Sequence, residues 1–159
     1  MAVGHVIGKQ LNNGFAGGYA IQPDMLVAAR VNVGDDVILF GDLVVYDDAD
    51  TSGVRKATDP TGKKIAGICS REVKQSNVYT QQDLVGFAKY EAVNCFQRGI
   101  ISVVCTGGDA KLGGDVYWKT GTGFTALSTD AVKIDGMQFA GSVDTNGIVA
   151  VSINEKLHV

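Results

Sequence analysis

The alternation of apolar and polar positions predicts β-strands from residue 35 onward. In the segment DDVILFGDLVVYDD (35–48), apolar side chains occupy both alternating sets of positions, and Gly41 interrupts them. A strand that is apolar on both sides is buried on both sides, and a glycine inside it often marks a bulge. We therefore expect one central strand over residues 35–46 with a bulge at Gly41.

Further short strands are expected between turns. The polar stretch 47–64 contains the turn signals DADTSG and DPTG and is interpreted as an excursion on the surface. The segments 65–80 (IAGICSREVKQSNVYT), 94–105 (NCFQRGIISVVC) and 115–119 (DVYWK) have the composition of strands. Only the window 79–90 (YTQQDLVGFAKY) is compatible with a helical turn.

The clearest local signal is a hairpin in MQFAGSVDTNGIVAVSIN (137–154). A two-residue Asn-Gly turn would bring apolar positions of one strand opposite the wrong face of the other, since a slip of one residue inverts a strand. A three-residue loop, 145–147, keeps the apolar faces together and places Phe139 opposite Ile153. This loop requires Gly147 at a positive φ angle.

The first thirty residues differ from the rest. Glycine, asparagine and the isolated aromatic residues Phe15 and Tyr19 occur there without a sustained period. We expect residues 1–30 to form an extended N-terminal arm or loop that is either mobile alone or docked on a partner. The whole chain, 1–159, is interpreted as one β-rich domain. Its predicted fold class is all-β, an antiparallel β-sandwich or small barrel with glycine-rich turns.

Composition supports this interpretation and excludes some functions. The chain has 21 glycines among 159 residues, roughly twice the usual share, which suits many tight turns. Its net charge is −3 and its basic residues are scattered, so a nucleic-acid-binding surface is not expected. No apolar stretch reaches the roughly 18 residues of a membrane span, and no membrane association is predicted.

Three cysteines, Cys69, Cys95 and Cys105, occur without C-x-x-C spacing. An odd number of cysteines without this motif favours reduced, buried thiols in a protein folded in a reducing cytosol. A disulfide or a metal-binding pair is the alternative.

Catalytic motifs are not apparent. His5 and His158 lie near the two ends, far along the chain from any candidate nucleophile, and Cys69 has no nucleophile elbow around it. The aspartate-rich run 47–50 lacks the closing glutamate of a calcium loop, and GGDAKLGG lacks the G-K-[ST] ending of a phosphate loop. We predict no catalytic residue, metal or cofactor; a hydrolase using Cys69 is the less favoured alternative.

Two places are candidates for partner contact. Tyr117 is expected to point outward because Val116 and Trp118 share the core-facing parity of a short strand. In segment 65–80, Arg71 and Glu72 fall on opposite faces and suit cross-strand or intersubunit salt bridges better than proton transfer. Residues from Arg71 to Lys74 form a candidate contact edge.

Several sequence blocks together resemble a known family. GFAGGYA, ILFGDLVV, IAGICSREVKQ, RGIISVVC leading to GGDVYWKT, and FAGSVDTNGIVAVSI occur in the order found in the structural cement proteins of tailed bacteriophages. The resemblance spans Gly14 to Ile153, and AGI-x-x-REVKQ is its most distinctive block.

This resemblance implies a non-enzymatic head-decoration protein that binds the outer surface of a capsid and bridges neighbouring major capsid subunits. The family implies a homo-dimer or homo-trimer, located on the virion after folding in the bacterial host cytoplasm. A phage-associated receptor- or carbohydrate-binding β-sandwich module is the alternative. The residues expected at a partner interface are Phe15, Tyr19, Arg71, Glu72, Lys74 and Tyr117.

Overall fold

The computed structural model describes residues 14–49, 52–71 and 86–154, and these residues form eleven strands. The strands are β1 (Tyr19–Asn32), β2 (Ile38–Leu39), β3 (Leu43–Tyr46), β4 (Gly53–Lys56), β5 (Ile65–Cys69), β6 (Gly86–Phe87), β7 (Ala92–Val104), β8 (Asp115–Lys119), β9 (Gly123–Thr125), β10 (Val132–Phe139) and β11 (Ile148–Ile153). The predicted all-β fold class is confirmed. None of the described residues belongs to a helix long and apolar enough to cross a membrane.

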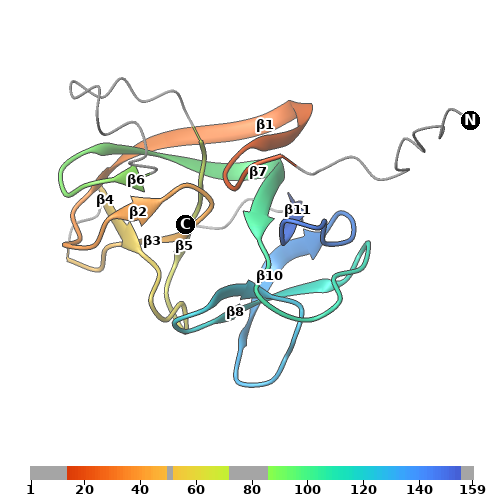
Figure 1. The fold of residues 1–159 in the computed structure, drawn as a ribbon. Coiled ribbons are helices and arrows are strands. Elements are labelled where there is room, and N and C mark those ends of the chain that lie inside the picture. The colour runs from red at the N-terminus through yellow and green to blue at the C-terminus, as the bar shows by residue number, and fades with distance from the viewer. Residues whose placement is uncertain (1–13, 50–51, 72–85, 155–159) are drawn as a thin grey trace, which may run out of the picture.

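Nine strands form one sheet in the order β1-β4-β3-β5-β7-β11-β10-β8-β9, and β2 and β6 form a separate pair. The long strands β1 and β7 run side by side, while β8 and β10 lie at the opposite end of the molecule (Figure 1). Because β7 pairs with both β1 and β5, the sheet folds back on itself. It does not close into a regular barrel, since β1 and β4 share only two residue pairs. The β1–β4 pairing is parallel and the other strand pairings are antiparallel.

The N-terminal arm was expected to extend to residue 30, but in the structure a strand already begins at Tyr19. Residues from Tyr19 onward form β1, which pairs with β7 from Tyr19↔Ile101 to Val31↔Ala92. The register shifts three times between Tyr19 and Val27. Each shift interrupts the two-residue period, so the sequence pattern does not show the strand. Residues 1–13 lie outside the described part of the chain, and an arm there stays a prediction.

The single strand expected over residues 35–46 was wrong. Gly41, with φ of 84°, lies in a turn rather than a bulge and separates β2 from β3. Ile38 before this turn and Leu43 after it are both buried although β2 and β3 belong to different sheets, whereas Leu39 is exposed.

Two other expectations need correction. The polar stretch 47–64 contains β4, which pairs with β3 and β1. Within the window 79–90, the described residues form β6 and a turn instead of a helix, and residues 79–85 lie outside the description. Short paired strands of two to four residues carry too little periodicity to be recognised in polar sequence.

The loop of the C-terminal hairpin is confirmed. Gly147 has a φ of 76°. The Asp144 N–H donates to the Ile148 carbonyl at 2.9 Å, which closes a three-residue loop. The Asp144 carboxylate also accepts the backbone N–H groups of Asn146 and Ile148, each at 2.8 Å. This aspartate therefore fixes the loop that the sequence predicted.

The predicted register beyond the loop was wrong by two residues, since Phe139 lies opposite Val151 and not Ile153. The difference arises next to the loop. Between the pairs Asp144–Ile148 and Ala140–Ala150, the first strand has three residues, 141–143, and the second strand has one. Because the shift is even, the apolar faces are unchanged, and Phe139 and Ile153 are both buried.

The buried residues form two clusters. The larger lies between the long strands and the β8–β11 end and includes Trp118, whose Nε1–H donates to the Thr58 carbonyl at 3.3 Å. The predicted core position of Trp118 is confirmed. The smaller cluster, which includes Ile38 and Phe87, lies where the β2–β6 pair packs on β3, β5 and β7. All three cysteines are buried thiols, as predicted.

Candidate partner interface

Three segments that are far apart in sequence meet at Gly17. The Arg71 N–H donates to the Gly17 carbonyl at 2.6 Å, and the Gly17 N–H donates to the Ser102 carbonyl at 2.8 Å. A Cβ atom on Gly17 would lie 2.9 Å or less from backbone atoms of Cys69, Arg71 and Gly41. Gly17 has φ of 74°, so both its angle and its surroundings require glycine. Gly17, Gly41 and Arg71, which belong to the blocks GFAGGYA, ILFGDLVV and IAGICSREVKQ, therefore meet at one junction.

This junction presents an arginine against two aromatic rings. The Arg71 guanidinium carbon lies 5.0 Å from the centroid of the Phe15 ring and 5.5 Å from that of Phe40. Phe15 is 70% exposed and Arg71 is exposed. Phe40 is half-buried and meets Phe87 edge to face, with ring centroids 5.6 Å apart. We call Phe15, Phe40 and Arg71 the aromatic–arginine patch.

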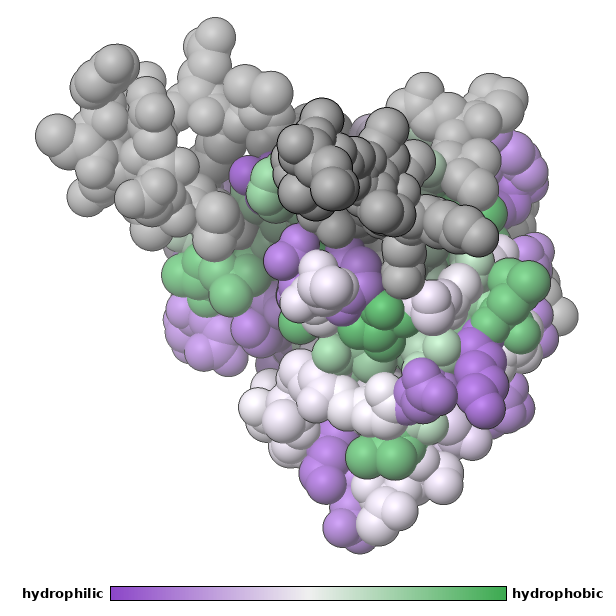
Figure 2. Space-filling model, turned by 45° about the vertical axis from the view of Figure 1, so that its right-hand side comes forward, coloured by the Kyte–Doolittle hydropathy of each residue, from purple (hydrophilic) through white to green (hydrophobic). Residues whose placement is uncertain are grey.

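The patch has the chemistry of a protein-binding anchor. Aromatic residues and arginine are enriched among the residues that dominate binding energies. The guanidinium keeps donors for a partner carboxylate while its planar face lies on the rings. On the face shown in Figure 2, apolar residues form separate patches among polar ones, which suits contact through local anchors. Val37 and Leu39, 45% and 41% exposed, add apolar surface on the segment that leads to Phe40.

The six residues expected at an interface have different positions. Phe15 and Arg71 come together in the patch. Tyr19 is half-buried, and its ring packs on Phe96 with centroids 5.6 Å apart, so it contributes to the core. Tyr117 is half-buried and lies opposite Lys133 and Thr125 in the sheet. Glu72 and Lys74 lie outside the described residues.

Phe40 was missed by the sequence analysis. It was assigned to the inside of a continuous strand, where its neighbours are apolar on both faces. Gly41 was the signal that could have identified Phe40. A turn at this glycine would end the strand at Phe40 and leave its side chain near a sheet edge.

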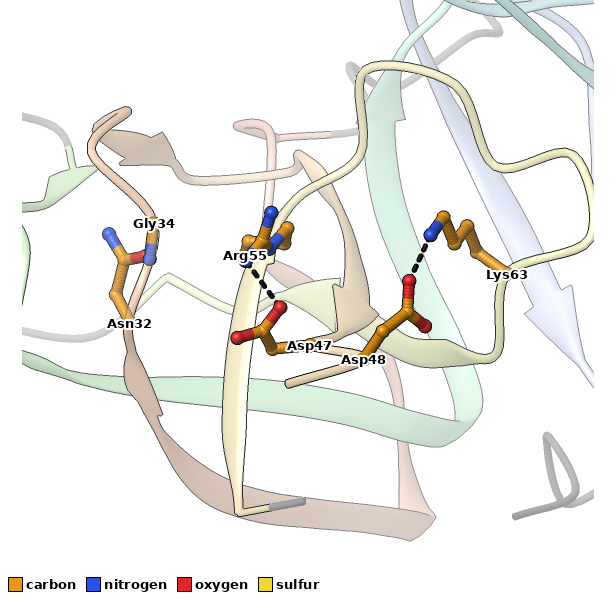
Figure 3. Close-up of polar contacts among 6 residues, drawn as sticks. All are labelled: Asn32, Gly34, Asp47, Asp48, Arg55 and Lys63. Carbon is orange, nitrogen blue, oxygen red and sulfur yellow. Dashed lines mark hydrogen bonds and ion pairs between the residues drawn. The ribbon is translucent and has the colours of Figure 1, made fainter. Parts of the chain in front are cut away.

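Asp47 and Asp48, which follow β3, each form an ion pair with a basic side chain. Asp47 pairs with Arg55, and Asp48 pairs with Lys63, as Figure 3 shows. The hydrogen bond from Lys63 and its charge hold the pKa of Asp48 below the ordinary value. In the same view, the Gly34 N–H donates to the Asn32 side chain at 3.0 Å. These contacts hold the loops near β4 in place, and they give Asp47 and Asp48 cationic side-chain partners.

The cysteines do not resemble a nucleophilic site. Cys69 and Cys95 have no exposed surface, and burial raises the pKa of the Cys95 thiol to about 12. A nucleophilic cysteine needs an electropositive and partly exposed setting. Among the described residues, no group of three or more histidine, cysteine, aspartate or glutamate side chains is placed to hold a metal ion.

Comparisons with known proteins agree with this fold. Residues 4–154 match the model of the phage family described as structural cement protein (E217 gp24/Pam3 gp6). A chain of the structure titled "The capsid of Myoviridae Phage XM1" has a similar fold, with a TM-score of 0.69 and 17% sequence identity over 98% of this chain and 99% of that one. No curated protein matches the chain significantly.

The family match over nearly the whole chain defines a structural protein of phages. The chain belongs to the phage structural cement protein family.

Proposed function

We propose that this protein binds the outer surface of a phage capsid and links neighbouring major capsid subunits, without enzymatic activity. It acts on the virion after folding in the cytoplasm of the host, as a homo-dimer or homo-trimer. The observation that carries the proposal is the exposed contact of Arg71 with Phe15 and Phe40, at the junction of three family-like sequence blocks. Family membership supports the same role.

The geometry of the junction lowers the entropy cost of binding at each contact. Gly17 holds the chain next to Phe15 against the backbone of Arg71, so the patch is preformed. A preformed anchor loses less conformational entropy when a partner covers it. A capsid carries many equivalent sites, and a small oligomer that contacts two subunits gains further through effective concentration. A cement function therefore requires only a modest affinity at each patch.

Cosedimentation with capsids tests the proposal. Purified protein is mixed with capsids of its own phage that lack it, and bound protein is measured in the pellet across a concentration series. Saturable binding at a fixed number of copies per capsid is expected. Arg71→Ala should weaken this binding at least about tenfold, within the range of interface anchors. The matched control is Arg98→Ala, which removes another exposed arginine, paired with Asp24 at 2.6 Å. Unsaturable or absent binding of the unmodified protein would refute the capsid role.

A further inference from the structure

Two of the three thiols face each other across a strand pair. Cys69 in β5 and Cys95 in β7 are direct partners in antiparallel register, and both belong to the smaller buried cluster. The Cys69 N–H donates to the Asp42 carbonyl, and the Cys69 carbonyl accepts the Gly41 N–H, each at 2.8 Å. Both backbone groups of Cys69 thus point away from β7. Cys69 and Cys95 form a non-hydrogen-bonded pair, the arrangement with the closest Cα atoms and side chains.

We propose that Cys69 and Cys95 form a reversible cross-strand disulfide when the protein meets a low-molecular-weight disulfide. Cα atoms in a non-hydrogen-bonded pair are about 4.5 Å apart, within the range that a disulfide spans. One cysteine thiolate attacks the small disulfide, forms a mixed disulfide and releases one small thiol. The second cysteine thiolate then attacks the protein sulfur and releases the other small thiol. Two protein thiols are oxidised, and one small disulfide is reduced to two thiols.

The fold permits only this one of the three possible pairings. Cys105 belongs to the larger cluster and lies ten residues beyond Cys95 along the direction of β7. An extended strand advances about 3.3 Å per residue, which places Cys95 and Cys105 on the order of 30 Å apart. In an unfolded chain, the opposite preference holds because loop closure favours the shorter 95–105 loop. The pairing that forms therefore reports whether the native strands direct it.

The small β2–β6 sheet controls access to the pair. Ile38 of β2 and Phe87 of β6 pack in the same cluster as the two cysteines, and only two residue pairs join these strands. A two-stranded sheet is marginally stable by itself and is a natural site of local opening. Burial keeps the Cys95 thiol protonated by raising its pKa to about 12, so the exchange proceeds when this cover opens.

The bond would tie the end of β5 to β7, two residues before Arg71. A disulfide requires Cβ atoms slightly closer than ordinary cross-strand neighbours, and a bond under strain is more easily reduced. Reversibility follows from this geometry. The inference concerns the thiols of this chain alone, and it holds whether or not the protein binds a capsid.

Peptide mapping of the full-length, folded protein tests the inference. Trypsin cleavage after lysine and arginine places the cysteines in three separate peptides, 65–71, 90–98 and 99–111. After incubation with oxidised glutathione, we expect 65–71 linked to 90–98, with the loss of two hydrogens and full reversal by dithiothreitol. In urea, 90–98 linked to 99–111 should dominate. Cys105→Ala should leave the native linkage unchanged, and Cys95→Ala should stop at a mixed glutathione disulfide on Cys69. Thiols that stay reduced in the folded protein, or a native linkage that includes 99–111, would overturn the proposal.

Discussion

The Arg71 guanidinium carbon lies 5.0 Å from the centroid of the Phe15 ring, although 55 residues separate the two in sequence. The Arg71 N–H holds the same segment through the Gly17 carbonyl. A cation over an exposed ring stabilises a protein by roughly 0.5–1 kcal/mol. The contact is therefore a small part of fold stability, and its exposure makes it available to a partner.

Replacing Arg71 by lysine should separate charge from shape. Arg71→Lys keeps the positive charge but loses the planar group that lies on the rings and donates in a fork. We expect Arg71→Lys to recover only part of the capsid binding lost in Arg71→Ala, with thermal stability near that of the unmodified protein. Binding isotherms and thermal unfolding curves of both variants measure this. Full recovery by lysine would show that charge alone acts at this position.

Gly17→Ala should destabilise the fold strongly. Its Cβ would lie within 2.9 Å of three backbone groups, and its φ of 74° disfavours any side chain. We expect a loss of about 3 kcal/mol, from about 1–2 kcal/mol for the angle and a similar amount for the clash. Gly14→Ala is the matched control, since Gly14 has φ of 87° and a methyl group added there would meet no other atom within 4 Å. It should cost only about 1–2 kcal/mol. Equal losses of unfolding free energy in the two variants, measured by urea unfolding, would contradict the close packing around Gly17.

Asp144→Ala should destabilise the C-terminal hairpin. The carboxylate accepts two backbone N–H groups, from Asn146 and Ile148, and the residue is only 8% exposed. Hydrogen bonds to a charged group contribute about 1.5–3 kcal/mol each, so the free energy of unfolding should fall by at least about 1.5 kcal/mol. Asp144→Asn retains an acceptor oxygen and should lose less. A change below about 0.5 kcal/mol in Asp144→Ala, the size of an ordinary surface substitution, would exclude this role.

Oxidation should stabilise the protein if Cys69 and Cys95 join. The bond closes a loop of about 27 residues, for which chain entropy gives a stabilisation of about 3–4 kcal/mol before strain is subtracted. Urea unfolding of the oxidised protein should therefore occur at higher denaturant concentration, and dithiothreitol should abolish the difference. In Cys95→Ala, which can form only the mixed glutathione disulfide on Cys69, oxidation should give no such stabilisation. The urea midpoint should be compared in protein whose linkage between peptides 65–71 and 90–98 has been mapped. If oxidation leaves this midpoint unchanged, strain in the disulfide cancels the gain in stability.

Acid should weaken the ion pair between Asp48 and Lys63. Lys63 lowers the pKa of Asp48 in the folded protein, so the pair stabilises fully above the ordinary value of 3.8. This contribution is lost as pH falls through the lowered pKa, because the carboxylate becomes protonated. Both side chains are exposed, so the effect should be small and should decrease with salt. The free energy of unfolding of Lys63→Gln should depend less on pH below about 4 than that of the control variant Lys64→Gln, which changes the neighbouring lysine.

The strands and core positions that depend on local pattern could be predicted from the sequence. β8 appeared because Val116 and Trp118 alternate with polar neighbours, and the loop at Gly147 appeared because only one loop length keeps both apolar faces buried. β1 could not be recognised, since its register shifts interrupt the period near Tyr19.

The candidate site was only partly predictable. Phe15 and Arg71 were expected at an interface as separate features, on a loose arm and on a contact edge. Their contact, and the addition of Phe40, depends on how β5, the β2–β3 turn and residues 14–18 pack together. Parity assigns a side chain to a face of its own strand and carries no information on which distant segment covers that face.

Cryo-electron microscopy of capsids mixed with the purified protein tests the central claim most directly. The account predicts ordered density for the protein on the outer capsid surface, spanning neighbouring capsid subunits, with Phe15, Phe40 and Arg71 against a subunit. Capsids mixed with Arg71→Ala at the same concentration should show reduced occupancy at these positions. Absence of the protein from the outer surface, or full occupancy with these three residues facing solvent, would contradict the account.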